Sequence, residues 1–239
     1  MLDFLKDAPS RSVSTFNSGP GERVYRQGDS LDRLYFVERG HLSVSATSTT
    51  GRVVLVDLVG PGGVVGEQSL GGDAPSSYSV ESATRCTGWS VSASWLRTAV
   101  HQSPAASGAV IRAIAASRVS TYNRNLEYLT LSTRPRLARL LLTLATPGSD
   151  GALMPLKPRP SHERLAELAS TTRPRVTVLI NEFKRGGYVL ERGDELLVTP
   201  RLADVLAVDV AGTRGHGGID HLQQLLVSLG RGSYPDVET

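Results

Sequence analysis

The chain has 239 residues, 40% of them hydrophobic and 21% charged, a mixture typical of one large or two modest globular domains rather than of a disordered or fibrous chain. No segment approaches the roughly 18 uninterrupted apolar residues of a membrane span, and the first residues lack a secretion signal's basic start and apolar run, so we expect a cytoplasmic protein without a membrane partner. The net charge is only +3, but Lys and Arg outnumber Asp and Glu by 12 to 8 in residues 134–204 and by only 12 to 11 in residues 1–133, which indicates that the later region contacts a polyanion.

One cysteine and five histidines argue against the common cofactor chemistries. Cys86 alone cannot form an internal disulfide or ligate an iron–sulfur cluster, and its setting in "ATRCTGWSV" predicts a buried thiol on a strand. The histidines show no tight metal-binding spacing, and only His41 and His101 are even candidates for a haem ligand. We therefore expect no metal, haem or iron–sulfur cluster.

Residues 1–103 contain short runs rich in Val, Leu, Tyr and Phe, separated by glycines where the chain must turn tightly. The runs are "ERVYRQGDS", "RLYFVERGHLSVSAT", "GRVVLVDLVGPGG" and "SYSVESATRCTGWSVS". Strands at this spacing predict a β-roll or barrel.

Within this region, the segment "GGVVGEQSLGGDAPSSYSV" (residues 62–80) combines a glycine-rich turn, the carboxylate of Glu67, a loop and a run of small hydroxyls. Such a combination predicts a cradle for a small polar ligand. The segment holds no Lys or Arg that could neutralise an anion.

Residues 104–133 predict a long amphipathic helix. Six apolar residues follow one another at steps of four, four, three, four and three, which places them on one helical stripe. The stripe could pack on the chain's own β domain, but a helix of about seven turns is longer than a small roll, so we favour a parallel coiled-coil dimer. The predicted dimer interface consists of Ile111, Ala115, Val119, Tyr122, Leu126 and Leu129.

Residues 134–204 predict a further helix followed by a helix, a tight turn, a second helix and a hairpin. In "STRPRLARLLLTLATPG", Pro135 interrupts the long helix and a new one runs to Pro147-Gly148, with a hinge expected at residues 134–136. Ser161 and Thr172 are placed to cap the next two helices, with the turn "STT" between them.

The sequence indicates where the second of these helices begins and ends. Pro174 is tolerated in its first turn, and Gly186-Gly187 end it. The hairpin that follows turns at Gly193-Asp194. This order of elements is that of a winged helix-turn-helix, whose second helix enters the DNA major groove.

These segments together resemble the CRP/FNR superfamily of bacterial transcription regulators over nearly all of residues 15–204. The similarity rests on "RQGD", "LYFVERGHLSV", "GRVVLVDLVGPGGVVGE" and "SVESATRC" in the β region and on "RLAELASTTRPRVTVLINEFKRGGYVL" in the later one. It implies an α+β chain with a β-roll effector domain of the double-stranded jelly-roll type (residues 1–103), a dimerisation helix (104–133) and a winged helix-turn-helix domain (134–204). It also implies a homodimer that binds palindromic double-stranded DNA, with RNA polymerase as a possible partner.

The resemblance places an effector pocket between the roll and the long helix. Gly66-Glu67 match the turn with which cyclic-nucleotide-binding members hold phosphate and ribose, but Ser76-Ser77 stand where those members carry an arginine–serine pair. Without the arginine's bidentate, charged contact, cyclic AMP is possible but not favoured, and another nucleotide, an acidic metabolite or no ligand remain open. The predicted pocket residues are Gly66, Glu67, Gln68, Ser69, Ser76, Ser77, Ser120 and Thr121.

Two arginines of the long helix bear on this pocket. Arg118 and Arg124 could supply the positive charge that the segment 62–80 lacks. We favour the plainer interpretation, in which both are solvated flanks of the helix.

The resemblance also assigns the DNA-reading residues. Arg173 matches the family's guanine-reading arginine, whereas Pro174 replaces a glutamate and Val178 a second arginine. Lys184 and Arg185, toward the helix end, are placed to meet phosphates. The predicted DNA-binding residues are Thr172, Arg173, Arg175, Thr177, Val178, Lys184 and Arg185.

Other classes of function have less support. We find no phosphate loop, nucleophile elbow or paired-carboxylate motif that would make the chain an enzyme. A ligand-binding or interaction module without direct DNA regulation remains the alternative. Residues 205–239 extend beyond the family's usual end and include a short amphipathic helix, "IDHLQQLLVSL", that could pack on the DNA-binding domain or contact a partner.

Overall fold

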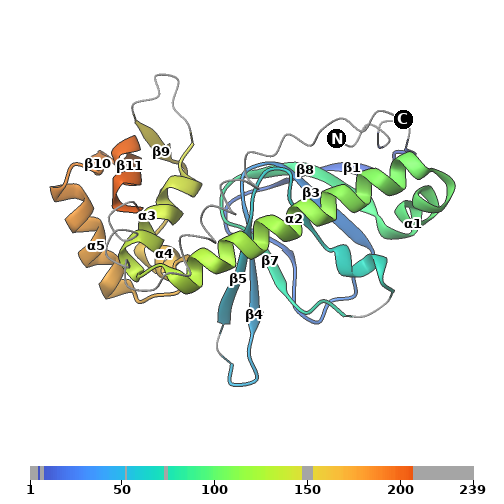
Figure 1. Cartoon of the computed structure of the whole chain (residues 1–239), viewed down its shortest axis with the longest axis horizontal. Coiled ribbons are helices and arrows are strands. Elements are labelled where there is room, and N and C mark those ends of the chain that lie inside the picture. The colour runs from blue at the N-terminus through green and yellow to red at the C-terminus, as the bar shows by residue number, and fades with distance from the viewer. Residues whose placement is uncertain (1–4, 6–7, 52, 73–74, 147–152, 207–239) are drawn as a thin grey trace, which may run out of the picture.

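The computed structural model describes residues 5, 8–51, 53–72, 75–146 and 153–206, except for the side chains of 124 and 127–129 (Figure 1). The predicted 205–239 extension therefore lies outside the described residues apart from its first two. Within the described part, no helix is long and apolar enough to cross a membrane.

Two four-stranded antiparallel sheets form the N-terminal β-roll, as predicted. The first has the order β1 (Val13–Ser18), β8 (Cys86–Ser92), β3 (Arg33–Arg39) and β6 (Val64–Val65). The second has the order β2 (Arg23–Tyr25), β7 (Ser79–Ser82), β4 (Leu42–Thr47) and β5 (Val53–Val59).

Apolar side chains from both sheets fill the space between them. Leu42 and Val80 are completely buried there, and so is Cys86, which confirms the predicted core thiol. Phe36 and Val37 are neighbours on β3 but belong to different buried clusters, because successive side chains of a strand point to opposite faces of the sheet.

A helix that the sequence analysis did not predict closes one end of the roll. α1 (Ala93–Gln102) begins directly after β8, and the Ser92 hydroxyl caps it by accepting a hydrogen bond from the Trp95 amide. Leu96 of α1 is fully buried against the first sheet.

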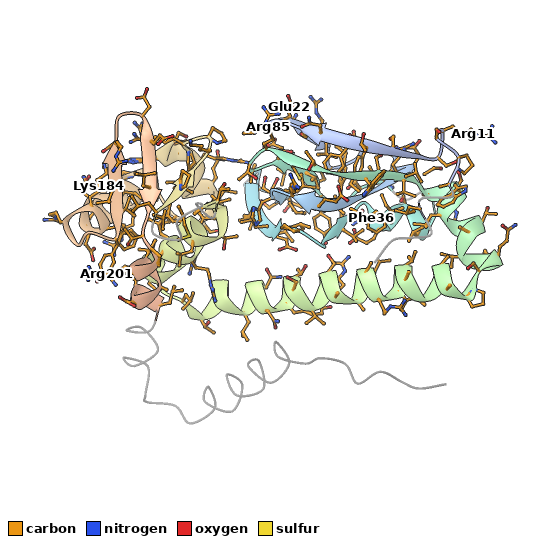
Figure 2. All side chains as sticks on the ribbon, turned by 90° about the horizontal axis from the view of Figure 1, so that it is seen from above. Arg11, Glu22, Phe36, Arg85, Lys184 and Arg201 are labelled. Atoms are coloured by element: carbon orange, nitrogen blue, oxygen red, sulfur yellow. The ribbon has the colours of Figure 1, made fainter. Side chains whose placement is uncertain are left out.

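The long helix α2 (Pro104–Thr130) runs along the roll and continues to the C-terminal domain (Figure 1). One face packs on the roll, and Phe36 of β3 lies on the side of the roll toward α2 (Figure 2). Val110 and Ala113 of α2 join Phe36 in a single buried cluster. The buried residues of this face are Ala106, Ala109, Val110, Ala113, Ser117 and Thr121.

The predicted apolar stripe lies on the opposite face of α2. Ile111, Val119 and Tyr122 are 65%, 52% and 69% exposed, and Ala115 is also exposed. Leu126 is partly buried, and the side chain of Leu129 lies outside the described set. The stripe residues Ile111, Ala115, Val119 and Tyr122 therefore do not pack on the chain's own roll.

The C-terminal domain consists of α3 (Thr133–Leu144), β9 (Met154–Leu156), α4 (His162–Leu168), α5 (Arg173–Arg185), β10 (Val189–Arg192) and β11 (Glu195–Val198). The strands form one antiparallel sheet of order β10-β11-β9. Strand β9 was not predicted. The core is built around Leu141, Leu165, Ile180 and Phe183, all fully buried.

The interruption between the two helices lies just before the hinge expected near residues 134–136. Helix α2 ends at Thr130, and Leu131 and Ser132 are not helical. Pro135 lies inside the first turn of α3. The first four backbone N–H groups of a helix have no partner within it, so a proline is tolerated there and starts α3 instead of breaking it.

The two domains share part of one apolar core. Leu58 of β5 is 3% exposed and belongs to the same buried cluster as Leu165 and Ile180. Beside it, Arg164 of α4 donates a hydrogen bond to the Ser43 hydroxyl of β4 at 2.9 Å and lies 3.6 Å from the Glu81 carboxylate.

A candidate DNA-binding surface and a cavity between roll and helix

Helix α5 is strongly two-sided. Val176, Leu179, Ile180 and Phe183 pack into the core, because they recur at the three- and four-residue spacing of one helical face. The other face and the N-terminal end carry exposed side chains, namely Thr172, Arg173, Pro174, Arg175, Val178, Asn181 and Arg185.

The N-terminus of α5 is shaped by its backbone. Thr172 occupies the N-cap position in an extended conformation, but its side chain makes no capping hydrogen bond, contrary to prediction. Pro174 lies within the first turn, where a missing N–H has no consequence. The hydroxyl of Thr172 is therefore left exposed at the end of the helix.

The C-terminus of α5 ends as predicted at the glycine pair. Gly187 has a φ of +68°, and the Tyr188 and Gly187 amides donate to the carbonyls of Phe183 and Lys184 at 2.9 and 3.1 Å. The rings of Phe183 and Tyr188 meet edge to face with their centroids 6.5 Å apart. This is the Schellman arrangement with its accompanying apolar contact, and it fixes the direction in which the chain leaves for β10.

Helix α4 approaches α5 through the short turn that the sequence predicted. The Ser161 hydroxyl caps α4 by accepting from the Arg164 amide, and Ser170 in the turn has a φ of +49°. The β10–β11 hairpin turns at Gly193, whose φ is +59°. The predicted helix, turn, helix and wing are thus all present.

Two predicted DNA-binding side chains have partners within the protein. Thr177 is partly buried, donates its hydroxyl proton to the Arg173 carbonyl, and lies 2.8 Å from His162 Nδ1. Lys184 forms an ion pair with Glu191 of β10, and the same carboxylate lies 2.5 Å from Arg159. Neither Glu191 nor Arg159 was singled out from the sequence, because their meeting depends on how the hairpin folds back onto α5.

A cavity of about 50 Å³ lies between the roll and α2. The roll contributes Tyr25, Asp57, Glu67 and Tyr78 among others, and α2 contributes Ile114, Ser117, Arg118 and Thr121. Polar and charged groups therefore enter the cavity from both sides.

Of the eight predicted pocket residues, Glu67 and Thr121 line this cavity and the other six do not. The hydroxyls of Ser69 and Ser76 donate to the nearby carbonyls of Gly66 and Tyr78. The remaining four also lie off the lining: Gly66 forms the turn, the Gln68 side chain accepts from the Ser77 amide, and Ser77 and Ser120 are themselves on the surface. Small hydroxyl side chains in a tight loop form hydrogen bonds with the loop's own backbone.

Arg118 does reach the cavity, so the interpretation of this residue as a solvated flank is wrong. Its guanidinium forms an ion pair with Glu67, and both side chains line the space between roll and helix. The side chain of Arg124 lies outside the described set. Helix α2 therefore supplies an arginine to the cavity, although the segment 62–80 contains none.

Further polar contacts hold the cavity wall. The Thr121 hydroxyl donates to the buried Asp57 carboxylate at 2.5 Å. Burial, together with the nearby Glu67 carboxylate, raises the pKa of the Tyr25 phenol well above its usual value. Tyr25 thus stays protonated and can act as a hydrogen-bond donor.

Both halves of the chain match known protein families. Residues 16–103 match the cyclic nucleotide-binding domain and residues 135–205 the Crp-like helix-turn-helix domain. The "CRP-like cAMP-activated global transcriptional regulator" of Mycobacterium tuberculosis is 26% identical over 182 residues, which cover 75% of this chain and 81% of that protein.

Two proteins from Thermus thermophilus are also similar. The "Transcriptional regulator LdrP" is 30% identical over 171 residues, covering 70% of this chain and 83% of its own length. A solved structure of a transcriptional regulator of the CRP/FNR family, 23% identical, superposes with a TM-score of 0.61 over 80% of this chain and 97% of that one. The last comparison concerns the fold alone.

Proposed function

The chain belongs to the CRP/FNR family of transcription regulators, and from this premise we propose that it is a homodimeric, sequence-specific DNA-binding regulator that reads DNA with α5. The observation that supports this most is the exposed N-terminal end of α5. It presents Arg173, Arg175 and Val178 to the outside while the opposite face of the helix is anchored in the core. This is the part of a recognition helix that contacts base edges.

The residues of this surface have separable roles. Arg173 is placed to bind a guanine through O6 and N7, and Val178 can make only apolar contact, for example with a thymine methyl group. Arg185, exposed at the far end of α5, can contact a phosphate directly, whereas Lys184 is paired with Glu191 in the free protein.

The dimer in this proposal forms through α2. Ile111, Val119 and Tyr122 are large apolar residues aligned on one face of a 27-residue helix, and more than half of each is exposed. A second α2 packed in parallel would cover this stripe and would place two α5 helices on one DNA duplex.

The cavity between roll and α2 is the proposed effector site. Its volume of about 50 Å³ is far below the 300 Å³ or more of typical ligand pockets, so a nucleotide would require Tyr25, Tyr78 or the Arg118–Glu67 pair to move. The name of the mycobacterial relative makes cyclic AMP the first compound to test, but we expect weak or no binding because Ser76 replaces an arginine.

Gel shifts with DNA fragments from the region upstream of the chain's own gene test the function. We expect a discrete shifted complex that resists competition by unrelated DNA. Failure to shift any genomic fragment, with or without candidate effectors, would instead favour an interaction module that does not bind DNA itself. Such a regulator acts on the bacterial chromosome, so cytoplasmic location and a contact with RNA polymerase belong to the same proposal.

Calorimetric titration with cyclic AMP, cyclic GMP, cyclic di-GMP and 2-oxoglutarate tests the effector site. Cyclic AMP binding at micromolar affinity or better would contradict our view of the cavity. A compound that binds should lose affinity when Arg118 is replaced by Gln, since this is the only arginine among the residues that line the described cavity.

A further inference from the structure

Four ionisable side chains meet where the wing folds back onto the helix-turn-helix. The Glu191 carboxylate of β10 contacts Lys184 of α5 through one oxygen and Arg159, in the segment before α4, through the other at 2.5 Å. His162, the first residue of α4, lies beside them and makes its hydrogen bond with Thr177 of α5. We name Arg159, His162, Lys184 and Glu191 the wing cluster.

The wing cluster is positively charged and accessible. Arg159 and Lys184 carry two positive charges against the single negative charge of Glu191, and Arg173 at the start of α5 adds a third close to His162. Between 29% and 37% of each of the three paired side chains is exposed. A solvent-accessible carboxylate held by two cations occupies the position that a phosphate oxygen would take in contact with the same groups.

The hydrogen bond of His162 determines which ring nitrogen titrates. The Thr177 hydroxyl lies 3.1 Å from the Arg173 carbonyl and 2.8 Å from His162 Nδ1. In the tautomer that carries the proton on Nδ1, the hydroxyl donates to the carbonyl and accepts from Nδ1–H, which leaves Nε2 without a proton. Protonation therefore takes place at Nε2 and adds a second N–H donor to the cluster.

The charged groups that shift the pKa of His162 are Arg159 in the segment before α4, Arg173 and Lys184 in α5, and Glu191 in β10. Burial, then the positive charges of Arg159, Lys184 and Arg173, lower the pKa of His162, and only Glu191 opposes them. Hydrogen bonds from Lys184 and then Arg159 lower the pKa of Glu191, which keeps that carboxylate ionised.

We propose that the wing cluster is a DNA phosphate-binding site that Glu191 occupies in the free protein, and that a phosphate displaces Glu191 while His162 takes up a proton. The inference rests on the proposed DNA-binding function and adds to it a competing carboxylate and a dependence on pH. A phosphate brought against Arg159 and Lys184 supplies negative charge beside the imidazole, which favours its protonated form.

The direction of the pH effect follows from linkage. DNA binding raises the pKa of His162 above its value in the free protein, so the gain in affinity is complete at pH below the free-state pKa. The gain is lost as pH rises through the pKa of the complex. Because the free-state pKa lies below 6.5, the affinity should fall between mildly acidic and neutral pH.

The test measures affinity by fluorescence anisotropy for a random-sequence duplex of about 30 base pairs, long enough for two half-sites. Wild type, Glu191→Gln, Glu195→Gln and His162→Asn are titrated between about pH 5 and 8 and at several salt concentrations. Glu195→Gln removes the same charge from the same hairpin, but its partner is Lys157, at 2.7 Å. In His162→Asn the side-chain amide can still donate to Thr177 but does not titrate.

We expect Glu191→Gln to bind about two- to fivefold tighter per half-site, the scale of one exposed ion pair, and Glu195→Gln to show no such gain. Wild type should take up as much as about one proton per half-site, and His162→Asn none. Equal affinities for the two glutamate variants, or an unchanged pH dependence in His162→Asn, would overturn the proposal. If wild type itself binds no DNA under any condition, the proposed function fails instead.

Discussion

Gly66 shows how a single residue fixes the turn that positions Glu67. Its φ is +83°, and a Cβ atom at this position would lie 2.6 Å from the backbone oxygen of Arg33. We expect Gly66→Ala to lower the free energy of unfolding by well over 1 kcal/mol, of which about 1 kcal/mol is the cost of the left-handed backbone. Urea unfolding measures the loss.

Gly51 offers a matched control for this change. Its φ is +78° and nothing lies within 4 Å of the Cβ position, so Gly51→Ala isolates the backbone cost. If the two variants unfold at the same urea concentration, the close approach to Arg33 does not constrain the turn.

Cys86 gives a second prediction at the level of one side chain. Burial raises the pKa of its thiol to about 11, so very little of the reactive thiolate exists at pH 8. We expect a thiol reagent to label the native protein far more slowly than the urea-unfolded chain, and the native rate to rise only at strongly alkaline pH. Rapid labelling of the folded protein at pH 8 would show that the roll opens easily.

Individual site residues were predicted from sequence where local backbone decides their place, and missed where distant segments meet. Glycine and proline positions marked the ends of α5, since their conformational limits act within one turn. The pairing of Arg118 with Glu67 and of Lys184 with Glu191 depends on how elements pack across the chain. No spacing in the sequence indicates either contact.

At the level of elements, helix α2 has one face packed on the roll and another that carries the exposed apolar stripe. Val119 belongs to the exposed stripe, whereas Ala116 is exposed on its flank. We expect Val119→Glu to convert the proposed dimer to monomers while leaving the fold intact. Residue 119 is exposed in the single chain, so the added charge would be buried only where two α2 helices meet. Sedimentation velocity at micromolar concentration measures the change.

Ala116→Glu adds the same charge to the same helix and should leave the dimer unaffected. A monomeric wild type, or a Val119→Glu variant that still dimerises, would rule out the stripe as the interface. Unchanged circular dichroism in both variants would show that neither substitution unfolds α2.

The elements missed from sequence, α1 and β9, are short or carry mixed signals. Helix α1 begins directly after β8, and no glycine or proline separates the strand from the Ser92 cap and Leu96. The sequence therefore contains no residue that marks the change from strand to helix. β9 is three residues long and includes Pro155, which normally argues against a strand. β9 forms because it pairs with β11 at the edge of the sheet.

At the level of the whole molecule, the contact between roll and DNA-binding domain combines apolar packing around Leu58 with the polar contacts of Arg164. We expect Leu58→Ala to destabilise the protein by about 2–5 kcal/mol, since it leaves a cavity in the shared core. Arg164→Ala should cost only about 1 kcal/mol, because the lost hydrogen bond to Ser43 is partly exposed to water.

Differential scanning calorimetry distinguishes these outcomes. One cooperative transition in wild type that splits into two in Leu58→Ala would show that this residue couples the domains. Equal, small effects of both substitutions would mean that the domains are stabilised independently of their contact.

The central claim, that α5 reads DNA as one half of a symmetric dimer, is tested most directly by selecting binding sites from random duplexes with wild type and Arg173→Ala. We predict a palindromic wild-type motif with half-sites about one helical turn apart. We also predict that Arg173→Ala loses specification of one G·C pair in each half-site, worth about 1–3 kcal/mol. No enriched motif, or the same motif with the same information content from both proteins, would contradict the claim.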